Sequence, residues 1–297
     1  MTLHLVLAIS YLTVGNAYMA FPFYPDNSKC NGTAVSNSSI YAIRSSGRII
    51  SRFSFSGSAI TSSTISLVGL TTDYLDIDTF TDTLYITDTT NHQVKKITTS
   101  SSPYIISDVA GIFGQPGSTG DGSPATSGYL KSPKGISIDR VKKDIYVADS
   151  LNFKVRKIDS FGKLTTVVGT GNPGCTFVNQ VAATEICLGF PIDVAIDAYN
   201  DATATVLYIA DYNNGVLMMH STGIINVISP VSGGFGPTSI TVDMLHNCIY
   251  YQNSKIWKMS LDRHTTAQIA GGGTGVILNT GYGVNGTSAN LPSVAGK

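Results

Sequence analysis

Short apolar runs of four or five residues recur along the chain, and they are clearest between residues 133 and 171. The runs are rich in β-branched residues, are separated by turn-forming residues, and cover positions 136–138, 145–148, 155–158 and 164–168. Such runs are typical of strands joined by tight turns rather than of helices. The pattern therefore predicts a four-stranded antiparallel meander in this stretch.

Weaker copies of the same pattern precede and follow it, and the second strand of each unit carries a matching tyrosine, at Tyr85, Tyr146, Tyr208 and Tyr250. The connecting loops repeat as well, because SPATSGYLKSP at 123–133 aligns on VAATEICLGFP at 181–191, and GTSANLP follows at 286–292. Repeated units of this size bury their faces only against one another. We therefore expect one all-β domain, a β-propeller of four-stranded antiparallel blades.

The two ends of the repeat array differ from its middle. Residues 40–53 align with 155–168 and supply only the second half of a unit, so the sequence predicts four full blades plus a half blade. Residues 18–37 are rich in Pro, Asn and Ser, lack periodicity and are expected to form an irregular extension before a propeller at 38–297. Since the sequence stops soon after the third loop copy, we expect a C-terminally truncated ring with unpaired strand edges.

The first seventeen residues have the features of a secretory signal. An apolar run at 3–14 is followed by small residues before Tyr18, so residues 1–17 are predicted to be a signal peptide and the protein to be secreted. No later run reaches the roughly 18 apolar residues of a membrane span. Three acceptor sequons are candidates for glycosylation, at Asn31, Asn37 and Asn285.

The chain has four cysteines, Cys30, Cys175, Cys187 and Cys248. Their number is even and their spacing matches no zinc motif, so in an exported protein they are candidates for disulfides. Three pairings are open. We favour Cys175 with Cys187, since these residues stand twelve positions apart in one predicted loop.

Charged residues make up only 13% of the chain and the formal net charge is +0. A nucleic-acid partner is therefore not expected, because no basic field would hold a phosphate backbone. Four basic residues follow the third-strand valines, namely Lys95, Lys96, Arg156 and Lys157. We expect these side chains to lay aliphatic stems on the surface and keep their charged heads in solvent.

Two sets of acidic residues recur with the repeat. The first set follows the second strands and is paired three residues later with asparagine, at Asp88, Asp149 and Asp211 with Asn91, Asn152 and Asn214. Short side chains of this kind accept turn amide protons, so we interpret them as structural turn residues. The second set, at Asp78, Asp139, Asp197 and Asp243, is expected to cap hairpins, with an axial ring holding a hard cation as the alternative.

No catalytic, cofactor or metal site is predicted. Two stretches, GTGNPG at 169–174 and GYGVNG at 281–286, fit the dinucleotide-binding fingerprint, but Pro173 interrupts the helix that this fingerprint requires. The five histidines show no zinc-binding spacing. We also judge that none of the polar residues in the repeat departs from it as a catalytic group would.

The order IYVADS, Asn, VRKI, Gly and VVGTG resembles the NHL repeat, and GDGSPATSGYL resembles the longer variant found in teneurin-type and related extracellular proteins. The resemblance covers residues 40–292 and is weakest in the fourth unit, where Gln252 and Asn253 replace the usual Ala and Asp. It implies a six-bladed propeller, and the predicted units fall short of that number.

Three hypotheses for function follow. The favoured one is a secreted NHL-type propeller that serves as a non-catalytic binding module, with a protein or small ligand at a propeller face. The second is an enzyme resembling amidating-lyase or lactonase-like propellers, although no position here matches their metal ligands. The third is an extracellular lobe of a larger receptor or adhesion protein.

Overall fold

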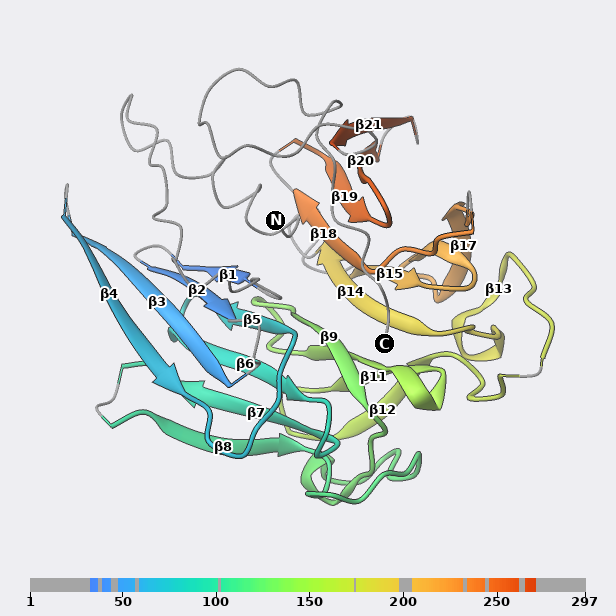
Figure 1. The fold of residues 1–297 in the computed structure, drawn as a ribbon. Helices are drawn as coiled ribbons and strands as arrows, with labels where there is room; N and C mark the ends of the chain where they lie inside the picture. Colours follow the sequence, from blue (N-terminus) through green and yellow to red (C-terminus); the bar gives the residue numbers. More distant parts are fainter. Residues whose placement is uncertain are drawn as a thin grey trace.

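The computed structural model describes residues 33–36, 39–43, 48–56, 59–100, 103–173, 175–197, 205–231, 234–243, 246–261 and 265–270. These residues form five antiparallel sheets arranged as the blades of a propeller (Figure 1). The only helical elements in the described part are three 3-10 turns, Ala125–Ser127, Ser150–Asn152 and Ala183–Glu185. The predicted all-β propeller is therefore confirmed.

Each blade has its four main strands in chain order from the axis outward. Blade 1 contains β1 (Thr33–Val35), β2 (Ser39–Ile43), β3 (Ile49–Ser56) and β4 (Ala59–Ser66). Blade 2 contains β5 (Leu75–Asp78), β6 (Thr83–Asp88), β7 (Gln93–Thr98) and β8 (Ile105–Ala110). Blade 3 contains β9 (Pro133–Ile138), β10 (Ile145–Asp149), β11 (Lys154–Ile158) and β12 (Leu164–Val168).

Blade 4 contains β14 (Pro191–Asp197), β15 (Val206–Asp211), β16 (Gly215–Met219) and β17 (Ile224–Ser229). A short fifth strand, β13 (Val181–Ala182), pairs with the outer side of β17 in this blade. Blade 5 contains β18 (Ser239–Asp243), β19 (Cys248–Gln252), β20 (Ile256–Ser260) and β21 (Thr266–Ala270). In Figure 1 the innermost strands of the five blades surround the middle of the molecule.

Buried apolar side chains lie between consecutive blades rather than within one central core. Four clusters join blades 1 and 2, 2 and 3, 3 and 4, and 4 and 5. Both faces of a middle strand are covered, so every residue of β10 is buried. This two-sided burial explains why the stretch around Tyr146 reads as a continuous apolar run. Among the described residues, no hydrophobic cluster joins blade 5 to blade 1.

Blade 1 corrects the prediction of a half blade. Residues 40–53 are not the outer half of a unit, because β2 and β3 are the second and third strands of a complete four-stranded sheet. The innermost strand β1 has three residues and lies inside the stretch predicted to be irregular. The outermost strand β4 has the sequence AITSSTIS, with exposed Ser and Thr at 61–64. Neither strand has the apolar run by which the other strands were found.

Several predictions fall on residues outside the described ranges. These are the signal peptide at 1–17, Cys30, the sequons at Asn31, Asn37 and Asn285, and the third loop copy at 286–292. Within the described part of the chain, no helix has the length and apolar character needed to cross a membrane.

Candidate functional site at the propeller axis

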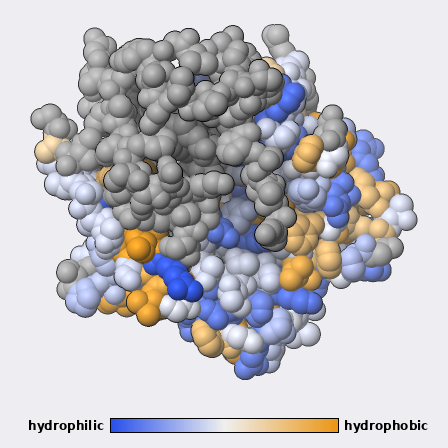
Figure 2. Space-filling view, in the orientation of Figure 1, coloured by the Kyte–Doolittle hydropathy of each residue, from blue (hydrophilic) through white to orange (hydrophobic). Residues whose placement is uncertain are grey.

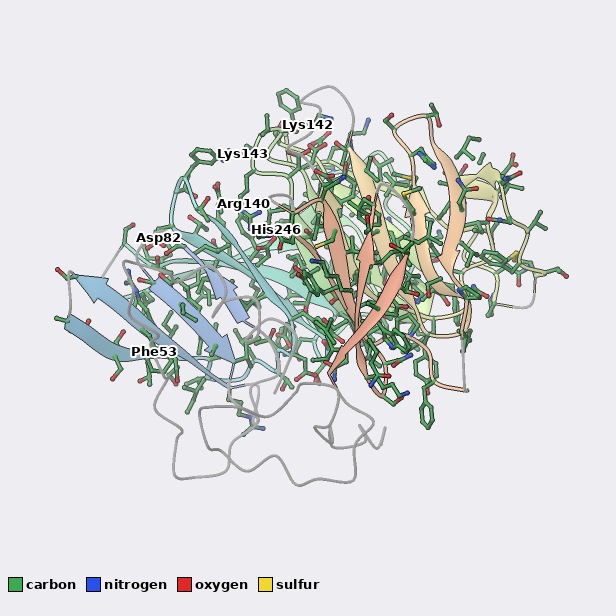
Figure 3. All side chains as sticks on the ribbon, turned by 90° about the horizontal axis from the view of Figure 1, so that it is seen from above. Phe53, Asp82, Arg140, Lys142, Lys143 and His246 are labelled. Atoms are coloured by element: carbon green, nitrogen blue, oxygen red, sulfur yellow. A yellow bond between two sulfur atoms is a disulfide. The ribbon has the colours of Figure 1, made fainter. Side chains whose placement is uncertain are left out.

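The innermost strands of blades 2 to 5 enclose a cavity of about 160 Å³ near the axis. Its polar lining comes from Tyr74, Asp76, Ser137, Arg140, Asp193 and Thr241. Arg140 belongs to the hairpin between β9 and β10, which also carries Lys142 and Lys143 (Figure 3). This cavity is the candidate site because it gathers two carboxyl groups, a guanidinium and three hydroxyls from four blades and the loop before β5.

Asp76 links blade 2 to blade 3. Its Oδ1 accepts hydrogen bonds from the amide of Ile77 at 2.7 Å and from Arg140 Nη2 at 2.8 Å. Its Oδ2 accepts one from the amide of Ile138, on β9, at 2.9 Å. Arg140 Nε also donates to the carbonyl of Ile77 at 3.0 Å, so the two side chains hold neighbouring blades together by charge-assisted bonds.

Asp193 likewise links blade 4 to blade 5 by hydrogen bonds. Its Oδ1 accepts from the amide of Val194 at 2.9 Å, and its Oδ2 accepts from Ser239 Oγ and the amide of Ile240, each at 3.0 Å. The side chain is buried, and burial raises its pKa to about 7 against the opposing effect of these three hydrogen bonds. The charge of Asp76 adds a smaller increase. Asp193 is therefore a carboxyl group that changes its charge near neutral pH.

Asp76 and Asp193 both break the repeat, and the sequence analysis missed this. Aligned on the recurrent aspartate that ends or follows each innermost strand, Asp76 occupies the position of Ser137, Ala195 and Thr241. In the same alignment, Asp193 occupies the position of Tyr74, Gly135 and Ser239. These two acids are therefore polar residues that depart from the repeat, and the sequence pattern did not lead us to expect them. The signal was present, but it lay in single positions of the inner strands rather than in a motif.

Gly135, on β9, is required by the position of Asp193. A Cβ atom added at residue 135 would lie 2.2 Å from Asp193 Oδ1 and 2.4 Å from Asp193 Cα. Backbone atoms cannot yield as a flexible side chain does, so only glycine allows blades 3 and 4 to approach this closely. The absence of a side chain at 135 thus makes room for Asp193 of blade 4.

Some polar groups of the cavity have hydrogen-bonding capacity left over within the described residues. Arg140 uses Nε and Nη2 but not Nη1, and the hydroxyls of Ser137 and Thr241 have no protein partner. The volume corresponds to about five waters at roughly 30 Å³ each. It lies below the roughly 300 Å³ at which pockets for drug-sized ligands begin. The cavity suits ordered water or a very small polar molecule.

Tyr74, at the entrance to β5, adds a hydroxyl to this cavity. Burial raises its pKa well above the usual range, and the charges of Asp193 and Asp73 raise it further. The tyrosine is therefore a neutral hydrogen-bonding group at physiological pH. Within the described residues, no group of three or more His, Cys, Asp or Glu side chains is arranged to hold a metal ion.

The recurrent aspartates after the second strands accept turn amide protons. Asp88 Oδ1 accepts from the amides of Asn91 and of Thr71 in the preceding loop, at 3.4 and 3.3 Å. Asp211 accepts from the amides of Asn214 at 3.0 Å and Gly189 at 2.8 Å. Each aspartate therefore ties its own turn to the loop that leads into its blade.

In blade 3 the corresponding aspartate has an additional partner that contradicts a prediction. Asp149 accepts from Asn152 Nδ2 at 2.8 Å and the Lys131 amide at 2.7 Å. It also pairs with Arg156 Nη1 at 3.2 Å. Arg156 was expected to keep its charged head in solvent, but its side chain is fully buried and pairs with Asp121 as well, at 2.9 Å. The reason is the long loop before β9, which folds over β11 and covers the guanidinium.

The other three basic residues retain some exposure. Lys95 pairs with Asp108, and Lys157 pairs with Asp144 at 3.2 Å. Lys96 is exposed. Arg156 alone of these four is taken out of solvent, because the loop before β9 places Asp121 and the carbonyl of Tyr129 against its guanidinium.

The aspartates that end the innermost strands cap the hairpins that follow. Asp78 accepts from the amide of Phe80 at 3.0 Å, Asp139 from that of Val141 at 3.0 Å, and Asp243 from that of His246 at 3.2 Å. Lys143 reaches from the next blade to Asp78, with 3.0 Å between Nζ and Oδ2. These carboxyl groups are engaged at the hairpins rather than directed together at the axis.

The structure joins Cys175 and Cys187 by a disulfide, with 5.7 Å between their Cα atoms. Cys248, on β19, is buried and has no disulfide partner among the described residues. The bond closes the loop that carries β13 and the 3-10 turn at Ala183–Glu185. It thereby restricts the segment that lies along the outer strand of blade 4.

Comparison with known proteins identifies the family to which this propeller belongs. Residues 35–244 match the family described as the teneurin NHL domain. The chain belongs to the teneurin NHL domain family. It is similar to Teneurin-1 of Gallus gallus, with 30% identity over 171 residues, and to Teneurin-3 of Danio rerio, with 27% identity over 169 residues. Each match includes 52% of this chain and 6% of the relative, so the chain corresponds to a small part of these teneurins.

Solved structures agree on the fold of this teneurin-type domain. A chain of a nidogen/laminin complex superposes with a TM-score of 0.59 at 16% identity, covering 82% of this chain and 80% of that one. A streptogramin B lyase superposes with a TM-score of 0.55 at 13% identity, covering 83% and 70% of the two chains. At such identities the similarity concerns the propeller fold alone.

Proposed function

We propose that this chain is the propeller domain of an extracellular, teneurin-like protein and that it binds a protein partner through one propeller face without catalysing a reaction. The family match and the 6% coverage of the teneurin relatives support a domain of a longer chain. The predicted signal peptide and sequons support export. This proposal unites the binding-module and extracellular-lobe hypotheses.

The observation that carries the proposal is how the axial acids are used. All four carboxylate oxygens of Asp76 and Asp193 accept hydrogen bonds from backbone amides, Ser239 or Arg140. A general base needs a lone pair directed at substrate, and a substrate site needs room. The groups that break the repeat therefore connect blades, which is a structural role, and binding is left to the outer surface.

Exposed apolar side chains on one face support a protein partner there. Antiparallel topology puts the interblade loops and the turns between second and third strands at the same end of every blade. This end carries more of the exposed apolar residues, namely Val68, Phe113, Leu151, Tyr212 and Phe235, than the other end, which carries Phe80, Val141 and Phe161. On the face seen in Figure 2, hydrophobic residues lie in separate groups among hydrophilic ones.

The test uses the mature domain, labelled and applied to intact cells of the source tissue. We expect saturable binding that Phe113→Ser and Phe235→Ser together weaken about tenfold, equivalent to about 1.4 kcal/mol. Phe161→Ser, at the other end of the blades, is the matched control and is expected to bind normally. Turnover of an ester, lactone, glycoside or peptidylglycine substrate, abolished by Asp193→Asn, would contradict the proposal.

A further inference from the structure

The outer strand of blade 4 is covered by a segment of this chain. Strand β13 pairs antiparallel with β17, with Val181 opposite Ile225 and Ala182 opposite Ile224. The amide of Gln180 donates to the carbonyl of Ile225 at 3.0 Å. The amide of Ala183 donates to the carbonyl of Gly223 at 2.8 Å. These bonds make β13 a short fifth strand, which provides hydrogen-bond partners for some of the backbone groups on the outer edge of β17.

Blade 3 has an equivalent cover from the repeated loop. The amides of Gly122 and Ala125 donate to the carbonyls of Leu164 and Gly162, at 2.8 and 2.7 Å. The amide of Leu164 donates in turn to the carbonyl of Ser123 at 3.0 Å. The same loop copy therefore supplies an extended stretch to the outer strand of each blade that it precedes.

Strand β8, the outer strand of blade 2, has no such cover in the described structure, since it ends the sheet order of that blade. The stretch between β4 and β5 runs only from residue 67 to residue 74 and has no copy of the repeated loop. Among the described residues, the backbone groups on this outer side consequently have no strand partner, as on a free strand edge. Blade 2 thus differs from blades 3 and 4 in one missing segment.

The side chains of β8 nevertheless match those of a covered strand. Register with the third strands makes Ile106, Leu164 and Ile225 equivalent, since they lie opposite Ile97, Ile158 and Met219. Leu164 and Ile225 are 0% exposed, whereas Ile106 is 37% exposed and its neighbour Ile105 is 58% exposed.

Blades 1 and 5, whose outer strands β4 and β21 also end their sheets in the part of the chain that the structure describes, are built differently. In blade 5 the equivalent position, opposite Met259, is an exposed threonine, Thr266. In blade 1, exposed Ser and Thr occupy positions 61–64 of β4. Among the described strands, this register position is thus polar in blades 1 and 5, which lack a cover, and apolar in blades 3 and 4, which have one. Of the described outer strands without a cover, only β8 has apolar residues, Ile105 and Ile106, at and beside this position, although Asp108 further along the strand is charged and pairs with Lys95.

We propose that β8 is a docking edge for an extended segment of a partner polypeptide, which adds to blade 2 as a short antiparallel strand. The segment has the chemistry of the two covers seen in this chain, namely small and β-branched uncharged residues such as Ser-Pro-Ala and Val-Ala-Ala. Main-chain bonds to Ile106 and its neighbours supply affinity, and burial of Ile105 and Ile106 supplies preference for apolar residues. The inference rests on the proposed binding role and adds a second contact for a partner, at the outer edge of blade 2, to the face that carries Phe113 and Phe235.

The experiment titrates the purified mature domain with a synthetic peptide copying residues 179–186, NQVAATEI, and follows backbone amide shifts by NMR. We expect saturable shifts confined to β8 and its neighbours at up to millimolar peptide. A control peptide has proline in place of the residues equivalent to Gln180 and Ala183, which removes the two donors. That peptide is expected to cause no such shifts.

Two protein variants complete the test. Ile106→Glu is expected to weaken peptide binding about tenfold or more while leaving the thermal transition unchanged, because Ile106 is partly exposed. Phe161→Glu, an exposed apolar residue away from β8, is expected to bind as the unaltered domain does. Absence of shifts in β8, or equal binding by Ile106→Glu, would overturn the proposal.

A second copy of the chain is the competing occupant, and light scattering detects it. Self-association that Ile106→Glu abolishes would overturn the partner-segment proposal in favour of a dimer through β8. These readouts use the purified domain alone. Loss of cell-surface binding would therefore count against the proposed function without deciding whether β8 accepts a strand.

Discussion

Arg156 and Asp149 form an ion pair of 3.2 Å in which both side chains are 0% exposed. Asp121 binds the same guanidinium from the loop over blade 3, and the carbonyl of Tyr129 accepts from it at 3.3 Å. Arginine stays protonated in proteins, so the buried charge depends on these partners. The pair therefore fastens the long loop before β9 onto the blade that follows it.

Removing one partner of this pair is expected to destabilise the domain strongly. Asp149→Ala leaves the Arg156 charge buried with Asp121 alone, and such losses cost about 3–5 kcal/mol. Chemical denaturation measures the effect. Asp144→Ala, which breaks the partly exposed pair with Lys157, is the control and is expected to cost about 1 kcal/mol or less. Equal losses of unfolding free energy in the two variants would show that the buried pair stabilises the domain no more than the partly exposed pair does.

The raised pKa of Asp193 predicts that the stability of the domain falls as the pH rises. Because burial raises its folded-state pKa from 3.8 to about 7, the native state binds this proton more tightly than the unfolded chain does. The contribution to stability is full below about pH 4 and is lost as pH rises to about 7, by at most about 1.4 kcal/mol per pH unit.

The measurement compares denaturation of the unaltered domain and Asp193→Asn at several pH values. The stability difference, unaltered minus variant, is expected to fall between pH 4 and pH 7 and to level off above it. Asp159→Asn is the matched control, since Asp159 caps an exposed turn. A difference that stays constant or rises with pH would be incompatible with a raised pKa at Asp193.

Gly135→Ala is expected to disturb the contact between blades 3 and 4. The added Cβ would lie 2.2 Å from a carboxylate oxygen and 2.4 Å from the Cα of Asp193, so strands must separate, at a cost of about 1–3 kcal/mol or more. Gly162→Ala, where no atom lies within 4 Å of the added Cβ but φ is positive, measures backbone strain alone. A smaller loss for Gly135→Ala than for Gly162→Ala would argue against this packing.

The disulfide between Cys175 and Cys187 is expected to stabilise the loop that covers blade 4. Replacing both cysteines by serine should lower the free energy of unfolding by about 2–3 kcal/mol, by loop-closure entropy. It should also speed proteolysis between residues 175 and 187, since the cover then opens more readily. Non-reducing peptide mapping checks the bond first. Free thiols at both positions in secreted protein would refute it.

The sequence predicted well those elements whose burial imposes an apolar run. The second strands around Tyr146 and Tyr208 are covered on both faces, so their pattern identified the blades and the propeller. Strand β1 and the Ser- and Thr-rich β4 lack that pattern, because one is very short and the other faces solvent. Blade 1 was consequently predicted as a half blade.

The axial site was harder to predict because its residues are defined by contact across blades. Asp76 and Asp193 stand in the sequence as single substitutions within a repeat, and their partners Ile138 and Ile240 are backbone amides, which carry no sequence signal. Arg156 was misjudged for a related reason. Its burial depends on a loop about thirty-five positions earlier, whose path over β11 the local pattern does not specify.

The central claim is that this teneurin-type propeller binds a protein partner at its surface and uses its axial acids to join blades. The most direct measurement is binding of the labelled mature domain to intact cells, with Phe113→Ser/Phe235→Ser and Asp76→Asn compared at a temperature where all are folded. We predict saturable binding that the double phenylalanine variant weakens about tenfold and that Asp76→Asn retains. Binding lost in Asp76→Asn but kept in the double variant would contradict the account.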